Sequence, residues 1–108
     1  MTATAPTKHY PTQNEFEALV GYGIAVARGA GIHLCGIHVA NHRGLSLQVD
    51  TAADVDRLAG LLGITGVPVV LGAREGHGGT LFREGAVSIP LPEFEGCRVP
   101  VDVYGPAS

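Results

Sequence analysis

The chain has 108 residues, which suits one domain and is too short for two ordinary ones. Apolar residues make up 45% of it and charged residues 16%, so it can bury a core and lacks the composition of a disordered chain. The net charge is −3, and the six arginines are spread along the chain, which argues against nucleic-acid binding because that needs clustered cations.

The organisation and location of the protein follow from simple patterns. Residues 1–11 predict a flexible N-terminal tail and residues 12–108 a single domain. No signal peptide is recognisable, and no stretch approaches the ~18 apolar residues that cross a membrane, so we expect a cytoplasmic protein without membrane association. In the reducing cytoplasm Cys35 and Cys97 would stay as thiols, whereas an oxidising compartment would permit one disulfide between them.

The domain is predicted to begin with a helix. Thr12 and Glu15 have the spacing of a capping box, in which each side chain bonds to the backbone amide of the other residue. Apolar residues then recur with the helical period, and the small residues among them favour close packing on a sheet. Gly29 and Gly31 predict the end of this helix.

A hairpin and a second helix are predicted next. In residues 32–40 the alternation slips at Cys35-Gly36, and a β-bulge at Gly36 would bring the apolar side chains back to one face. Residues 45–49 alternate regularly, as a half-buried strand does. The second helix is predicted to start at a cap formed by Thr51 or Asp50 and to end at Gly63.

The rest of the chain predicts strands. Residues 67–71 form a short strand with proline near its start, 72–79 a glycine-rich loop, and 80–89 a tight hairpin around a Glu-Gly pair. Residues 99–104 alternate, and Pro100 predicts an edge strand because proline cannot donate to a ladder. We therefore expect an α+β fold of order α-β-β-α-β-β-β, with a mainly antiparallel sheet of about five strands and two helices on one face.

One candidate site is a metal centre. His33, Cys35, His38 and Cys97 carry the nitrogen and sulfur ligands that zinc prefers. Their spacing is unlike that of known zinc motifs, and no Cys-x-x-Cys pair is present. The alternative interpretation is two exposed strand histidines and a buried thiol.

A second candidate is the loop that contains Arg74, Glu75 and His77. Its glycines allow backbone amides to bind an anion, Arg74 suits a carboxylate or phosphate, and Glu75 or His77 can move a proton. The loop is not a phosphate-binding loop, because no Gly-Lys-Ser/Thr follows. The alternative interpretation is a solvated hairpin loop, and we assign no catalytic residue.

The leading hypothesis is interaction through a surface. Small α+β domains leave sheet edges open, and open edges pair with other chains unless they are blocked. Tyr22 and Tyr104 are residues of the kind that protein interfaces favour. The sequence therefore predicts a small non-enzymatic protein-binding or regulatory module, acting through a sheet edge or surface on a protein partner or on itself as a homodimer, without a cofactor. The alternatives are a ligand-binding domain or enzyme that uses the loop 72–79, and a Cys/His metal-binding protein.

Overall fold

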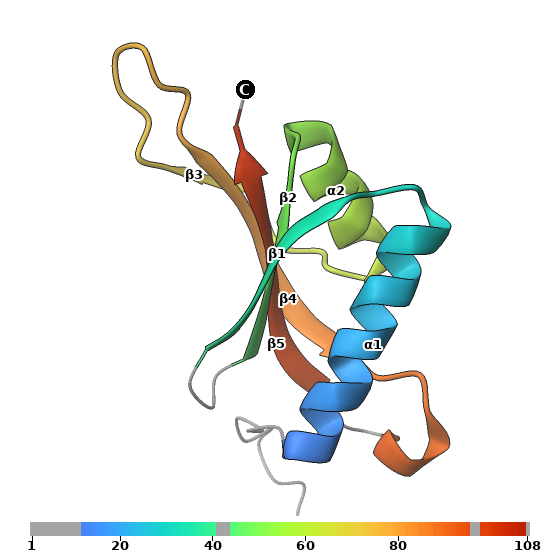
Figure 1. The fold of residues 1–108 in the computed structure, drawn as a ribbon. Helices are drawn as coiled ribbons and strands as arrows, with labels where there is room; N and C mark the ends of the chain where they lie inside the picture. Colours follow the sequence, from blue (N-terminus) through green and yellow to red (C-terminus); the bar gives the residue numbers. More distant parts are fainter. Residues whose placement is uncertain (1–11, 41–43, 96–97, 108) are drawn as a thin grey trace, which may run out of the picture.

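A computed structural model describes residues 12–40, 44–95 and 98–107. Two helices cover one face of a five-stranded sheet, which confirms the predicted α+β fold and its order of elements (Figure 1). The tail predicted for residues 1–11 lies outside the described residues. The elements are α1 (Gln13–Gly29), β1 (Leu34–Ala40), β2 (Gly44–Val49), α2 (Ala52–Leu61), β3 (Val69–Leu71), β4 (Thr80–Ser88), a 3-10 turn (Pro92–Phe94) and β5 (Arg98–Pro106).

Helix α1 begins and packs as predicted. The Glu15 amide donates to Thr12 Oγ1 at 3.3 Å and the Thr12 amide to Glu15 Oε1 at 2.8 Å, which completes the capping box. The helix ends before Gly31, which has a φ of +70°. A Cβ atom at Gly23 would lie 3.3 Å from Leu47 Cδ1, so this glycine allows α1 to lie close to β2.

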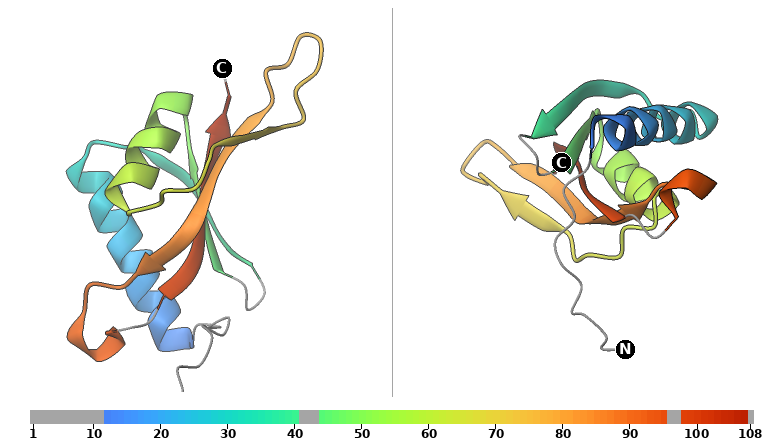
Figure 2. Two further views of the ribbon diagram at one scale, coloured as in Figure 1. Left: turned by 180° about the vertical axis from the view of Figure 1, so that it is seen from behind. Right: turned by 90° about the horizontal axis from the view of Figure 1, so that it is seen from below.

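Helix α2 follows the same local rules. Thr51 is its N-cap, and the Thr51 hydroxyl accepts a hydrogen bond from the Asp54 amide at 3.1 Å. The chain leaves the helix at Gly63, which has a φ of +79°. Figure 2 shows that α2 lies on the same side of the sheet as α1, while the opposite side carries no helix in the described part of the chain.

The strand order across the sheet is β1-β2-β5-β4-β3. All neighbouring strands are antiparallel except β2 and β5, which run parallel. A parallel pair needs a long connection, and the chain supplies one through α2, β3 and β4. The sheet is therefore mainly antiparallel, as predicted.

The predicted bulge in the first strand is present. The register of β1 against β2 shifts between Leu34 and Gly36, so Cys35 is the additional residue. After the shift Ile37 pairs with Leu47 and lies on the helix side of the sheet, like Leu34. The bulge thus keeps the apolar side chains of β1 on one face.

Two predictions about the C-terminal strands are wrong. The segment predicted as a hairpin around Glu84 and Gly85 is one continuous strand, β4, because β5 pairs with it along its whole length. Strand β5, predicted at an edge, lies in the middle of the sheet between β2 and β4. Pro100 is tolerated there because it precedes Val101, where the pairing with β2 begins.

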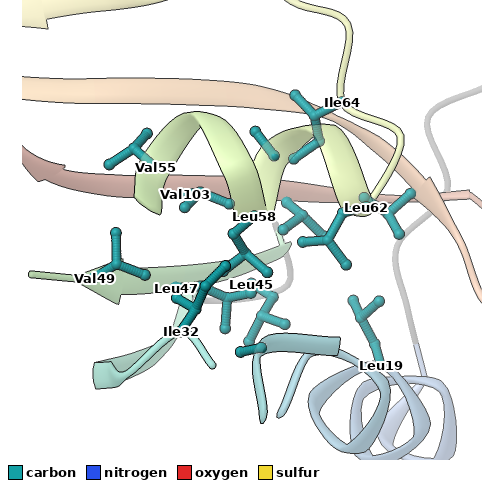
Figure 3. Close-up of a cluster of buried hydrophobic side chains, with 14 of the residues drawn as sticks. Leu19, Ile32, Leu45, Leu47, Val49, Val55, Leu58, Leu62, Ile64 and Val103 are labelled. Carbon is teal, nitrogen blue, oxygen red and sulfur yellow. The ribbon is translucent and has the colours of Figure 1, made fainter. Parts of the chain in front are cut away.

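The core lies between the helices and the inner face of the sheet (Figure 3). Fully buried side chains come from strands β2, β4 and β5 and from both helices, and they include Leu19, Leu45, Leu47, Val49, Val55, Leu58, Val87, Val99 and Val103.

Arg83 is a polar exception on this inner face, and it connects β4 to the segment after α2. Its guanidinium donates to Gly66 O at 2.9 Å, to Asp56 Oδ1 at 2.9 Å and to Ile64 O at 3.4 Å. These bonds satisfy an arginine that lies mostly out of solvent and hold the start of the β3 segment against the sheet.

Candidate functional site: the outer face of the sheet

The face of the sheet that points away from the helices, here called the outer face, carries two ordered rows of side chains. Strand register places each row across four neighbouring strands. Residues paired across a ladder project to the same face. The polar row consists of His38, Ser46, Asp102 and Glu84, in the order β1, β2, β5, β4, and the aromatic row of Gln48, Tyr104, Phe82 and Val69, in the order β2, β5, β4, β3.

The aromatic row is joined by direct contacts. The rings of Phe82 and Tyr104 are stacked, with centroids 5.5 Å apart and planes 20° apart. The Tyr104 hydroxyl donates to Gln48 Oε1 at 3.3 Å. Burial, together with the charges of Asp102 and Cys35, raises the pKa of Tyr104, so the hydroxyl remains a donor. The row ends at the sheet edge with Val69, whose side chain is exposed.

The polar row holds a carboxyl group in unfavourable surroundings. The pKa of Asp102 is raised, mainly because the carboxyl group is partly buried. A hydrogen bond from Ser46 and the nearby His38 oppose this rise, and the charge of Glu84 adds to it. Asp102 Oδ1 is buried and has no hydrogen-bond partner among the described residues. Glu84 lies directly opposite Asp102, and like charges at such positions repel.

Exposed apolar side chains gather at the two edges of the sheet. Within the described ranges, Ile37 and Val39 are exposed on β1, and Val69, Val70 and Leu71 on β3. An unpaired strand with apolar side chains is a typical place for association with another chain. Val67, two residues before β3, is also exposed.

Three of the four residues predicted as metal ligands, His33, Cys35 and His38, lie in the described structure and are not grouped as a metal site. His33 Nδ1 lies 2.9 Å from Asp50 Oδ2, and the Cys35 thiol donates to Gln48 O at 3.5 Å. Desolvation and the neighbouring Asp50 raise the pKa of Cys35, which disfavours the thiolate that binds metals. Among residues 12–40, 44–95 and 98–107, no three His, Cys, Asp or Glu side chains are grouped to hold a metal ion. Cys97 lies outside the described residues, so the four-ligand site stays a prediction.

The predicted ligand-binding loop forms the exposed tip of the hairpin between β3 and β4. Arg74 and His77 close this tip through two backbone hydrogen bonds of 2.9 and 2.8 Å, around Gly76 with a φ of +76°. The side chains of Arg74, Glu75 and His77 are all exposed, and the hairpin extends beyond the sheet (Figure 1). His77 Nδ1 accepts a hydrogen bond from the Gly79 amide at 3.0 Å. A role in ligand binding stays a prediction.

The two tyrosines predicted for an interface lie on opposite sides of the sheet. Tyr22 belongs to α1 and packs partly against the core, whereas Tyr104 lies in the aromatic row. The sequence reasoning missed Phe82, Asp102 and Glu84, because β4 was predicted as a hairpin and β5 as an edge strand. The alternation of polar and apolar residues in 98–106 is the signal that could have found Asp102.

Comparisons of the chain with protein-family models, with curated proteins and with solved structures found no match. Among the described residues, neither helix combines the length and the apolar character needed to cross a bilayer. The function proposed for the protein therefore depends on the geometry of its surfaces.

Proposed function

We propose that the protein is a small non-enzymatic protein-binding module of the cytoplasm, whose copies associate as a homodimer through their outer faces. The observation that carries this proposal is the order of the side chains in the polar row. An imidazole, His38, stands at the β1 end and a carboxylate, Glu84, at the β4 end. Such a row is complementary to the same row of a second copy when a two-fold rotation brings the β1 end of one row opposite the β4 end of the other.

A two-fold axis parallel to the strands, midway between β2 and β5, would exchange the two ends of each row. His38 of one copy would then face Glu84 of the other, and Ser46 would face Asp102. The first contact places an imidazole beside a carboxylate that has no ion pair among the described residues.

The aromatic row fits the same arrangement. Under this axis Phe82 would lie over Gly36 of the other copy, where the Gln48 side chain fills the space of the absent Cβ. Tyr104 would lie over Gln48. Aromatic rings that are partly exposed in one copy would thereby become buried, and aromatic residues are enriched at the centres of interfaces.

The overlap of the two outer faces suits a small interface. Under this axis β1, β2, β5 and β4 face the other copy, with lengths of 7, 6, 9 and 9 residues. At about 3.3 Å per residue and about 4.8 Å per strand, the two faces would bury roughly 900 Å² in total, an area typical of weak association. Two sheets packed face to face in this way would resemble the aligned layers of a β-sandwich.

A charge-reversal experiment tests the proposal. His38→Glu would place two carboxylates opposite each other in the dimer, and we expect its dissociation constant to rise about tenfold or more, measured by sedimentation equilibrium. Adding Glu84→Lys to the same chain should restore dimerisation. Within one chain β1 and β4 are separated by two strands, a distance of about 14 Å, so the two altered side chains cannot pair inside a single copy.

The matched control is Glu17→Lys, which reverses a charge on the exposed side of α1 and should leave the dissociation constant unchanged. A monomer mass at all protein concentrations would refute the homodimer. A dimer that is insensitive to His38→Glu, or that the double variant fails to restore, would refute the outer face as its interface.

A further inference from the structure

A groove of about 360 Å³ separates α1 from the edge strand β1, on the inner side of the sheet. Helix α1 contributes Ile24, Ala27 and Arg28 to its lining, and the segment that leads into β1 contributes Ile32, His33, Leu34 and Ile37. The groove thus has apolar walls, one unpaired strand edge and two nitrogen-bearing side chains. Its volume lies within the range of sites that hold a few side chains or a small ligand.

The groove exists because α1 covers β2 and stops short of β1. Ile37 is 38% exposed although its cross-strand neighbour Leu47 is 0% exposed, and Val39 is 56% exposed beside Leu45 at 2%. Helix α1 packs against β2 and α2. The inner side of β1 is therefore an apolar strip that residues 12–40, 44–95 and 98–107 leave uncovered.

The unpaired charge at this groove is positive. Arg28 is exposed, and in the described part of the chain its guanidinium makes no hydrogen bond or ion pair. His33 is already engaged by Asp50, so it adds no free charge. An arginine beside an apolar groove is complementary to a carboxylate carried by an apolar ligand.

We infer that this groove binds an extended acidic segment of a partner protein, which adds to the free edge of β1. Backbone hydrogen bonds to β1 would hold the segment, and alternate apolar side chains would enter the groove beside Ile37. A carboxylate of the segment would pair with Arg28. The groove is lined by α1 and β1 on the helix side of the sheet, so this site is separate from the outer-face dimer proposed above and remains accessible in it.

Selection from a phage-displayed library of random peptides tests the inference. The full-length protein should enrich peptides in which apolar and polar residues alternate and that contain Asp or Glu at one shared position. Against the Arg28→Glu variant, the enriched peptides should carry Lys or Arg at that position. One enriched acidic peptide, titrated by fluorescence anisotropy, should bind this variant about tenfold or more weakly than the unaltered protein.

Two further variants make the result decisive. Ile37→Asp changes an exposed position of the groove wall and should abolish enrichment, while Arg98→Glu reverses a charge on β5 and should leave it unchanged. Binding should persist in Glu84→Lys, because this variant changes the outer-face row on β4, three strands away from β1 and the groove. Absence of enrichment, or identical peptides with and without Arg28→Glu, would overturn the inference. If the protein self-associates and Arg28→Glu abolishes this self-association, the inference would also be overturned, because a second copy of the chain would then occupy the groove.

Discussion

The two faces of the sheet are made by the same strands but have opposite surroundings. On β2, Leu45, Leu47 and Val49 point into the core and are almost completely buried, while Ser46 and Gln48 alternate with them on the outer face. The inner face holds the helices through apolar contacts. The outer face carries ordered polar and aromatic rows that the described chain leaves uncovered. Because stability and association depend on different faces, substitutions should be able to change one property without the other.

The largest expected difference between the faces is in the free energy of unfolding. Leu47→Ala removes a fully buried side chain between β2 and α1 and should lower this free energy by about 3 kcal/mol. Phe82→Ala on the outer face should lower it by only about 1 kcal/mol, because its ring is only partly buried and stacks on Tyr104. Urea unfolding at concentrations where the protein is monomeric measures both. Equal losses would show that the outer face contributes to stability as the core does.

Arg83 tests a polar anchor of the inner face. Arg83→Met removes three hydrogen bonds to the segment after α2 and should lower the free energy of unfolding by about 2 kcal/mol. Arg57 is the matched control. Its side chain is 54% exposed, against 18% for Arg83, so Arg57→Met should lower the same quantity by less than about 1 kcal/mol. A larger effect at Arg57 would contradict this assignment of the anchor.

The smallest expected effect concerns Asp102 on the outer face. The fold raises the pKa of Asp102 above 3.8, so the ionised carboxylate destabilises the folded state at neutral pH, and this penalty disappears as the pH falls through the raised pKa towards 3.8. Asp102→Asn should therefore increase the free energy of unfolding at pH 7 by on the order of 1 kcal/mol, and the gain should shrink near pH 4.

Asp50 provides the control of opposite sign. The hydrogen bond from His33 lowers the pKa of Asp50, so its ionised form stabilises the fold above the ordinary pKa, and this contribution is lost on acidification. Asp50→Asn should consequently give no gain in stability at pH 7. Urea unfolding of both variants at pH 4 and pH 7 checks the two signs, and a gain at Asp50 equal to that at Asp102 would contradict them.

The sequence predicted the parts of the fold that depend on near neighbours. Thr12 and Glu15 form their capping box as predicted, and Thr51 is the N-cap of α2, where the sequence predicted Thr51 or Asp50. Both caps could be predicted because the bonded groups lie within one helical turn. The phase slip at Cys35 also predicted the bulge, since alternation is a property of a single strand. Of the two outer-face rows, the sequence analysis named Tyr104 as an interface residue and His38 as a metal ligand, because the rows themselves depend on which strands become neighbours.

Local hydrogen bonding and side-chain periodicity were thus enough to determine the two helices, the first hairpin and the α+β class. Only the tertiary structure decided that β5 lies between β2 and β4, and this insertion aligns His38, Asp102 and Glu84 in one row. The sequence could not predict this position of β5, because the residues that pair there, such as Ser46 and Asp102, are far apart in the chain. Their pairing depends on burying Val101 and Val103 beneath α2, which no pattern within a single segment can express.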